Sequence, residues 1–497
     1  MNYISTRGGE APCPSAYAIK QGIANDGGLF VPVSMPRLSG DDIQKLAAMD
    51  YRARAAFILS RFLTDYTYEE LLLCANQAYG ERFDTPAAAP LHALQNNCYC
   101  LELWHGPTCA FKDMALQIMP RLLPLALEKS GEKRTAVILV ATSGDTGKAA
   151  LEGFKDVPHT KIQVFFPSDG VSNMQKLQMI TQEGENVGVC GIYGNFDNAQ
   201  SGVKAIFSDE KYAQTLNENG YYLSSANSIN WGRLVPQIVY YFSAYCDLLN
   251  HKAIALGDKI DFCVPTGNFG DILAGFYAKQ MGLPVNKLVC ASNSNNVLTD
   301  FIRDGVYDRN RQFYTTVSPS MDILISSNIE RLVFNLTDGD AQKVSGYMAS
   351  LSKDGRYELD DDVKAKLAEH FEAFWCTEEE TKETIRRIYE EQHYLIDPHT
   401  AVAFHAAEAY AERSGSSAPM VVLSTASPYK FASAVCEALH CPVAENEADC
   451  ILQLQQHSGV PAPASLTDVL TKTVRHKDTC APADMQNTVS RFLGIHA

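Results

Sequence analysis

The chain has 497 residues, enough for about three domains at roughly 100 to 200 residues each. Hydrophobic residues are 46% and charged residues 20% of the chain, a composition typical of soluble globular proteins that excludes collagen and global disorder. The 42 Lys and Arg against 58 Asp and Glu give a net charge of −16. We therefore expect no nucleic-acid or membrane partner, so an anionic ligand must be held by a local site.

The cysteines and the N-terminus indicate a reduced, cytoplasmic protein. The 14 cysteines are scattered, and the close spacings of Cys98 with Cys100 and of Cys436 with Cys441 match no zinc or redox motif. The first 20 residues lack the apolar run of a signal peptide. Since no run of about 18 apolar residues exists, no membrane span is expected.

Residues 1–95 are predicted to form a mostly helical N-terminal domain. Helical patterns occupy 48–65 and 67–83, and AAAP at 87–90 is typical of a hinge. In 96–304, by contrast, short uninterrupted apolar runs alternate with helical patterns such as 231–250. Such runs are typical of strands buried on both faces of a parallel sheet. The expected strands are 135–141, 161–167, 186–193, 261–265 and 287–292.

The rest of the chain is expected to leave this core and return to it. Residues 305–395 are strongly helical and charged, so we predict a helical insertion, with the acidic run 377–380 as a solvated helix face. The core resumes at 396–440 with a strand at 420–427 and a helix after it, and 441–497 form a C-terminal appendage. The predicted fold class is α/β, a parallel-sheet core with a helical N-terminal domain and a helical insertion.

Two loops follow apolar runs and open helices, where free backbone N–H groups favour anions. ATSGDTGKAA at 141–150 suits an anionic ligand head, and a well-capped turn is its alternative. In VPTGNFGDILAGF at 264–276, Gly267 and Gly270 allow close approach of the backbone to a ligand. This second loop has no nucleotide-binding signature, so it predicts a phosphate cup of another kind.

Lys112 lies at the start of a third helical pattern, between Phe111 and Met114. Desolvation and the positive end of the helix should both favour its neutral amine, and such a lysine can form a Schiff base. The alternative is a surface lysine paired with Asp113. His105 and Cys109, four residues apart without further ligands, are more typical of packing than of a metal site, so no metal is expected.

Five ordered motifs carry a resemblance to a known family: HGPTCAFKD, ATSGDTG, SANSINWGR, PTGNFGD and STASPYKF, spread from 105 to 431. Together with MNYISTRGG and GIANDGGLFVP near the N-terminus, the chain resembles the threonine synthase family of pyridoxal-phosphate enzymes of fold type II, in its longer branch. The resemblance covers nearly the whole chain, apart from the final ~60 residues and stretches between 305 and 395.

The resemblance implies roles for individual residues. Lys112 would carry pyridoxal 5'-phosphate covalently, and Thr425 would face the pyridine nitrogen. The cofactor phosphate would be wrapped by Gly267, Asn268, Phe269, Gly270 and Asp271. The substrate would be bound by Thr142, Ser143, Asn227, Ser228 and Arg233. Of these, Arg233 offers a planar fork to a phosphoryl group, with a helix-start ion pair as its alternative.

Asp145 stands where shorter family members carry Asn beside the phenolic oxygen of the cofactor. Two negative charges there would repel, so we expect the carboxyl of Asp145 and that oxygen to share one proton. The alternative is that Asp145 caps the helix that begins at Gly147.

The implied reaction converts O-phospho-L-homoserine and water to L-threonine and phosphate, the last step of threonine biosynthesis. Lys112 would be the base at Cα and the carrier of most protons. Two alternatives stay open. The same architecture serves phospho-lyases and dehydratases that release a keto acid, and a chain of this kind could also be a scaffold paralogue without cofactor.

Overall fold

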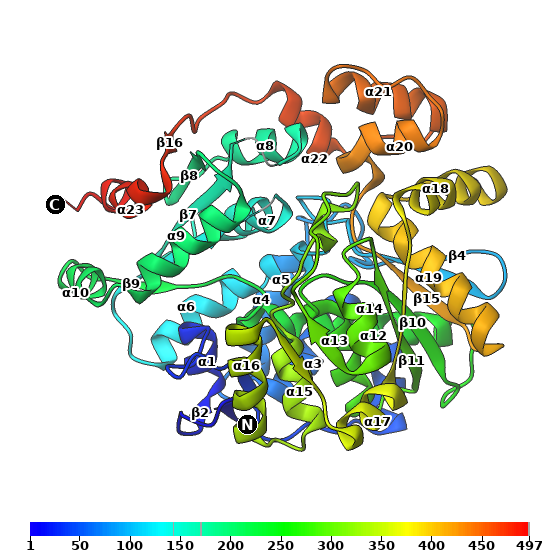
Figure 1. Ribbon diagram of the computed structural model, residues 1–497, viewed down its shortest axis with the longest axis horizontal. Coiled ribbons are helices and arrows are strands. Elements are labelled where there is room, and N and C mark those ends of the chain that lie inside the picture. Colours follow the sequence, from blue (N-terminus) through cyan, green and yellow to red (C-terminus); the bar gives the residue numbers. More distant parts are fainter. Residues whose placement is uncertain (143, 169–170, 496–497) are drawn as a thin grey trace.

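A five-stranded parallel sheet is built largely from the predicted apolar runs. Its strand order is β16-β8-β7-β6-β9, and it lies on the left in Figure 1. The computed structural model describes residues 1–142, 144–168 and 171–495. The strands are β6 (Thr135–Ala141), β7 (Thr160–Pro167), β8 (Val187–Ile192), β9 (Tyr221–Ser224) and β16 (Thr479–Cys480). The runs at 135–141, 161–167 and 186–193 are thus confirmed as strands.

A six-stranded sheet of order β14-β11-β10-β15-β5-β4 lies on the right in Figure 1. All neighbours are parallel except β4 and β5. Its strands are β4 (Leu91–Ala93), β5 (Cys98–Glu102), β10 (Ile260–Pro265), β11 (Val285–Ser292), β14 (Phe371–Trp375) and β15 (Met420–Ser424). The strands expected at 261–265, 287–292 and 420–427 are therefore present, the last one ending at Ser424.

Two segments that were expected to lie outside the sheets contribute strands to them. β14 lies inside 305–395, the range predicted as a helical insertion, and it pairs with β11 from Leu288↔Phe371 to Ser292↔Trp375. β16 lies in the C-terminal 441–497 segment and pairs with β8 through Thr479 and Cys480. Both ranges thus contribute strands to the core sheets, because a short edge strand needs only one paired neighbour.

The N-terminal region combines helices with a small antiparallel sheet of order β2-β1-β3. Its elements are β1 (Asn2–Ser5), β2 (Cys13–Pro14), α1 (Ser15–Gln21), β3 (Phe30–Pro32), α2 (Gly40–Ala47), α3 (Tyr51–Phe62) and α4 (Tyr68–Tyr79). Arg54 of α3 reaches Asp247 with 2.7 Å between Nη1 and Oδ1. The region therefore packs directly onto the α/β core.

Helices cover the sheets and link them. Those from the middle of the chain are α5 (Asp113–Leu116), α6 (Met119–Lys129), α7 (Asp145–Phe154), α8 (Asn173–Ile180), α9 (Phe196–Ser208), α10 (Glu210–Glu218), α11 (Trp231–Leu234), α12 (Ile238–Asn250), α13 (Gly270–Gln280) and α14 (Val297–Asp304). Those that follow are α15 (Ile329–Leu336), α16 (Ala341–Asp354), α17 (Asp361–His370), α18 (Glu378–Gln392), α19 (Pro398–Ser414), α20 (Ala432–Ala438), α21 (Glu447–Ser458), α22 (Ala464–Thr467) and α23 (Met485–Leu493).

Short elements complete the chain. β12 (Val306–Asp308) and β13 (Arg356–Glu358) form an antiparallel pair. The 3-10 turns are η1 (Val235–Gln237), η2 (Pro319–Met321), η3 (Pro428–Phe431), η4 (Asp468–Thr471) and η5 (Pro482–Asp484). η1 divides the helix expected over 231–250 into α11 and α12, because Pro236 has no N–H to continue the α-helical ladder.

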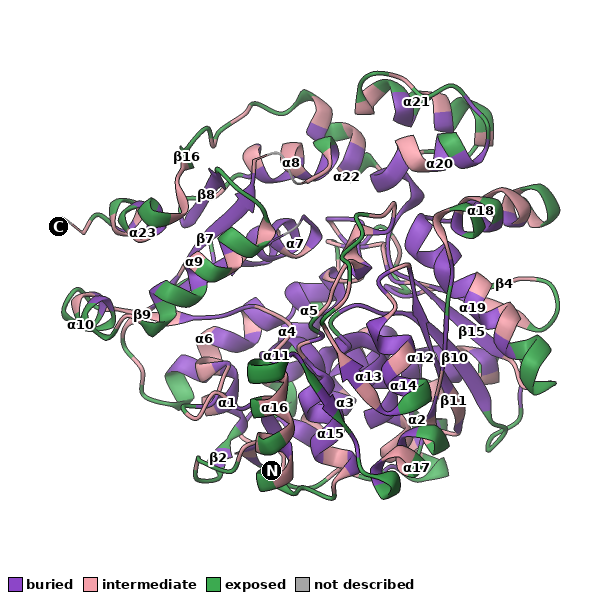
Figure 2. Ribbon diagram, in the orientation of Figure 1, coloured by how far each residue is buried: buried purple, intermediate pink, exposed green. Residues whose placement is uncertain are grey.

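Local sequence explains where the charged helix α18 begins and how deeply the sheets are buried. Thr377 caps α18 in a capping box with Glu380. Every residue of β8 and of β10 is buried, and Figure 2 shows these strands in purple, β8 at the upper left and β10 on the right. Among the described residues, no helix is both long enough and apolar enough to cross a bilayer.

Candidate active site

Five loops that leave the carboxyl ends of parallel strands carry the expected site residues, the usual position of a ligand site in such sheets. The Lys112 loop follows β5, the Asp145 loop β6, the loop that leads to Arg233 β9, the glycine loop β10 and the Thr425 loop β15. Two of them are joined directly. Phe111 N donates to Thr425 O at 2.8 Å, and Ser427 N donates to Cys109 O at 3.1 Å. Thr425 is therefore held beside the residue that precedes Lys112.

Lys112 is the residue before α5, in a setting that favours its neutral amine. Burial lowers its pKa to about 8, with Asp145 and Asp271 opposing the shift and Arg233 adding to it. This direction confirms the expectation from the sequence. Asp113 is buried and accepts from Thr108 N at 2.8 Å and Gln117 Nε2 at 3.0 Å. The alternative of an exposed lysine paired with Asp113 is therefore wrong.

Asp145 is the first residue of α7, and its partner is Lys430. The distance from Lys430 Nζ to Asp145 Oδ1 is 2.6 Å, with side-chain exposures of 0% and 3%. Burial opposes ionisation of Asp145, but the charges of Lys430 and Lys112 hold its pKa well below the usual range. The expected proton sharing with a cofactor oxygen is thus not supported, because Lys430 already neutralises the carboxylate.

Thr142 caps α7 instead of Asp145. Its hydroxyl accepts from Gly144 N at 3.0 Å and from Gly147 N at 2.9 Å. The N-cap residue itself is Gly144, which has no side chain that could cap the helix. The hydroxyl of Thr142, expected at the substrate, is therefore engaged by its own loop. Ser143 lies outside the described residues.

The glycine loop opens α13 without a side-chain cap. Phe269 adopts left-handed backbone, with φ of 62°, and its side chain is fully buried. Left-handed geometry at a helix start gathers successive N–H groups into an anion-binding nest. Asp271 turns its carboxylate to Ile272 N at 2.9 Å, and burial raises its pKa to about 6. The backbone of Gly267–Asp271, rather than its side chains, is what fits a phosphate.

A loop that the sequence did not indicate, residues 316–328, braces the glycine loop. Ser326 Oγ donates to Gly267 O at 2.8 Å, and Asn328 Nδ2 donates to Asn268 O at 3.0 Å. A Cβ on Gly267 would lie 2.7 Å from the carbonyl oxygen of Ser320. Gly267 is thus required for the close approach of this loop.

His399 fixes the position of Ser320. Ser320 N donates to His399 Nε2 at 3.1 Å, so the ring carries its proton on Nδ1, which lies 2.6 Å from Asp397 Oδ2. Ser320 Oγ in turn lies 3.5 Å from Asp145 Oδ2. Neither Lys430 nor His399 was predicted, since single charged or polar residues give no periodic signal. The flanking Tyr429 and Phe431 were the one sign that Lys430 is buried.

Arg233 is a buried cation in α11. Its side chain donates to the carbonyl of Ala226, its Nε has no partner, and no carboxylate of the described residues lies within ion-pair distance. Ser228 contacts Ser327 with 3.2 Å between hydroxyl oxygens, and Asn227 is partly exposed. The expected ion-pair alternative for Arg233 is therefore absent from the described part of the chain.

His105 and Cys109 are occupied by other partners. His105 contacts Asp84 at 2.6 Å and Glu102 at 2.7 Å. Burial opposes protonation, but these two carboxylates raise its pKa to about 9. Cys109 Sγ lies 3.0 Å from Ser465 Oγ. Cys109 is buried in the core, whereas His105 is held by a pair of carboxylates that the sequence did not indicate.

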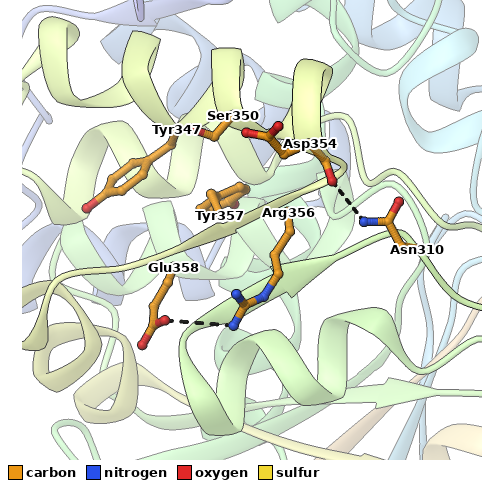
Figure 3. Close-up of a pocket in the computed structure, with 7 residues that line it drawn as sticks. All are labelled: Asn310, Tyr347, Ser350, Asp354, Arg356, Tyr357 and Glu358. Atoms are coloured by element: carbon orange, nitrogen blue, oxygen red, sulfur yellow. Dashed lines mark hydrogen bonds and ion pairs between the residues drawn. The ribbon is translucent and has the colours of Figure 1, made fainter.

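A surface hollow of about 430 Å³ lies apart from these loops, between α16 and the β12–β13 pair. Figure 3 shows Asn310 bonded to Asp354 and Arg356 paired with Glu358 at its rim. No candidate site residue lines it, so it has no part in the site described above.

Comparison with known proteins agrees with the geometry of the site. Three family models match: "Threonine synthase N terminus" over residues 2–79, "Pyridoxal-phosphate dependent enzyme" over 82–426 and "Threonine synthase, C-terminal" over 400–478. The last match extends the resemblance into the C-terminal segment, beyond the motifs seen in the sequence.

Individual relatives give the same result. Threonine synthase-like 1 of Homo sapiens is 43% identical over 85% of this chain, which spans 57% of that relative's length. Threonine synthase of Pseudomonas aeruginosa is 40% identical over 88% of this chain and 90% of its own. The solved pyridoxal-phosphate-bound threonine synthase from Brucella melitensis is 37% identical, covers 99% of both chains and has a TM-score of 0.88. The chain therefore belongs to the threonine synthase family of pyridoxal-phosphate dependent enzymes.

Proposed function

We propose that the chain converts O-phospho-L-homoserine and water to L-threonine and phosphate. The observation that carries this proposal is Arg233, a buried guanidinium without a carboxylate partner among the described residues. A buried charge is costly unless a ligand or a residue compensates it. A phosphorylated substrate supplies that compensation beside Lys112.

The residues present fit pyridoxal 5'-phosphate. The left-handed Phe269 and the start of α13 form a cradle for a phosphate, and Lys112 offers a partly exposed amine with a lowered pKa. Thr425 is 5% exposed and lies at the end of β15 beside the Lys112 loop. When bound, the cofactor supplies an electron-withdrawing ring that acidifies protons next to the substrate amine.

The chain's own residues then have distinct tasks. The amine of Lys112 removes the proton at Cα and moves it onward, because an amine with a pKa near 8 exchanges protons readily close to neutral pH. Asn227 and Ser228 orient the substrate carboxylate, and Arg233 binds the phosphate that leaves from Cγ. The loop 316–328 holds the glycine loop in place through its bonds to Gly267 O and Asn268 O.

Product analysis tests the proposal. The purified protein with pyridoxal phosphate and O-phospho-L-homoserine should release threonine and phosphate in equal amounts. A keto acid with ammonia would identify a phospho-lyase or dehydratase instead. No product from a colourless protein that fails to bind pyridoxal phosphate would support the scaffold alternative.

We also propose the division of the chain at about residues 95, 304, 395 and 440, and a cytoplasmic location. All 14 cysteines are free, which supports a reducing compartment. Limited proteolysis and fractionation of expressing cells test these two proposals.

A further inference from the structure

The ion pair between Asp145 and Lys430 connects the two large sheets. Asp145 begins α7 directly after β6 of the five-stranded sheet, and Lys430 lies in η3 after β15 of the six-stranded sheet. The two side chains meet at 2.6 Å, almost completely buried. A contact from one sheet to the other is thus made next to the loop that carries Lys112.

Lys430 also fixes the loop that leads to Lys112. Its Nζ donates to Thr108 O at 2.9 Å, four residues before Lys112. Asp145 Oδ1 accepts in addition from Gln175 Nε2 of α8 at 3.0 Å. The buried ion pair of Lys430 and Asp145 therefore joins α7, α8 and the Lys112 loop.

Asp145 keeps its other oxygen largely unused. The contact of Oδ2 with the Ser320 hydroxyl is long, at 3.5 Å. A buried ion pair often adds little net stability compared with apolar residues of the same volume. Stability alone is therefore a poor explanation for placing Lys430, with 0% exposed side chain, at this junction.

We propose, on the basis of the function proposed above, that Lys430 is a positioning residue that clamps α7 to the Lys112 loop through Asp145 and Thr108. The Nζ of Lys430 is engaged by Asp145 Oδ1 and Thr108 O, so Lys430 acts on the site through these partners. It acts by holding Lys112 and the unused oxygen of Asp145 in fixed relation to each other across the two sheets.

Lys148 provides a matched control. It also belongs to α7 and is buried, and its Nζ pairs with Glu152 at 3.2 Å and with Gln182. Both partners lie on α7 or just after α8, so this pair does not cross to the six-stranded sheet. Lys148→Met removes a buried lysine from the same helix without touching the clamp.

The experiment compares Lys430→Met and Lys148→Met with the natural protein, each loaded with pyridoxal phosphate and without substrate. We expect Lys430→Met to speed hydrogen exchange in Thr108–Lys112 and the first turn of α7 by about 10-fold or more. We expect its kcat to fall about 100-fold with a much smaller change in KM, the size expected for a misplacement of about 1 Å. Lys148→Met should keep kcat, with faster exchange confined to α7 and the end of α8.

Two outcomes would overturn the proposal. One is equal loss of thermal stability in both variants with kcat retained by Lys430→Met, which would make Lys430 structural only. The other is unchanged exchange in both segments. Exchange is read without substrate, so a wild-type product other than threonine would refute the proposed function but leave this test intact.

A second variant covers the case in which Lys430→Met fails to fold. Lys430→Met/Asp145→Asn leaves no unpaired buried charge, so it should fold with a Tm near that of the natural protein. Exchange is decisive there, because Asp145 itself lies in the site. Hydrogen exchange in Thr108–Lys112 that is faster than in the natural protein supports the clamp. Exchange at the same rate as in the natural protein refutes it.

Discussion

Replacing Arg233 should separate stability from substrate binding. Burial lowers the pKa of this 3% exposed guanidinium to about 10, which corresponds to about 3 kcal/mol of desolvation cost. Arg233→Met removes that cost and loses one hydrogen bond from the charged guanidinium to Ala226, worth about 2 kcal/mol. The free energy of unfolding of the ligand-free protein should therefore rise by about 1 kcal/mol.

Substrate binding should change in the opposite direction. Loss of a buried charged partner to a phosphate costs about 2 to 5 kcal/mol, so KM for O-phospho-L-homoserine should rise by on the order of 100-fold. Arg233→Lys should also raise KM more than it weakens cofactor binding, because a point charge cannot replace a bidentate fork. Thermal unfolding in phosphate-free buffer, cofactor titration and initial rates give the three quantities.

The reasoning is refuted if Arg233→Met is less stable and KM is unchanged. Loss of pyridoxal phosphate with unchanged KM would instead assign Arg233 to the cofactor phosphate. Arg233 is connected to the glycine loop through Gln237. The side chain of Gln237 donates to Arg233 O at 2.8 Å and lies 3.6 Å from the position of a Cβ on Gly270.

Lys112→Ala should abolish turnover while the Tm stays near that of the natural protein, and borohydride reduction with peptide mapping should place the cofactor on Lys112 only; label on another lysine would contradict the assignment. The rate of cofactor binding should rise with pH through about 8, because the lowered pKa of Lys112 makes its amine neutral above that value; a pH-independent rate between 7 and 9, to within about twofold, would argue against it. Gly153→Ala should cost about 2 kcal/mol or more of unfolding free energy, because its Cβ would lie 1.9 Å from Leu116 O; a neutral effect in urea unfolding would disprove that packing. The pKa of His105 is raised from 6.5 to about 9, so its contribution is complete below 6.5 and is lost as pH rises through 9. The stability difference between the natural protein and His105→Gln should thus shrink from pH 6 to pH 9.5, and a constant difference would be inconsistent with this titration.

Much of the sheet core can be predicted from the sequence, because a strand buried on both faces is an uninterrupted run of apolar residues. The run 135–141 coincides with β6, every interior residue of which is buried. The strand β14 has no such run, since its exposed Trp375 and partly exposed Glu372 interrupt the apolar pattern. Its place is set by pairing with β11, about 80 residues away along the chain.

In the candidate site, too, the features that are local in the sequence could be predicted and the long-range contacts could not. Lys112 and the glycine loop were recognisable, because a strand, a turn and a helix start are all local features. The pairing of Asp145 with Lys430, 285 residues apart, was not. From sequence, Asp145 carried an uncompensated charge and seemed to require a shared proton, and the fold supplies the missing cation instead.

Local charge reconciles the acidic chain with a phosphorylated substrate. Surface carboxylates more than about 10 Å away are screened by salt, so the net charge of −16 has little effect inside the site. Of the three cations that the described residues place there, Lys430 is paired with Asp145, and Lys112 has a pKa lowered toward neutrality. Arg233 is thus the fixed positive charge left for an incoming phosphate, while the backbone of the glycine loop suits the phosphate of the cofactor. One free guanidinium and one backbone nest are what a reaction with two phosphate groups requires.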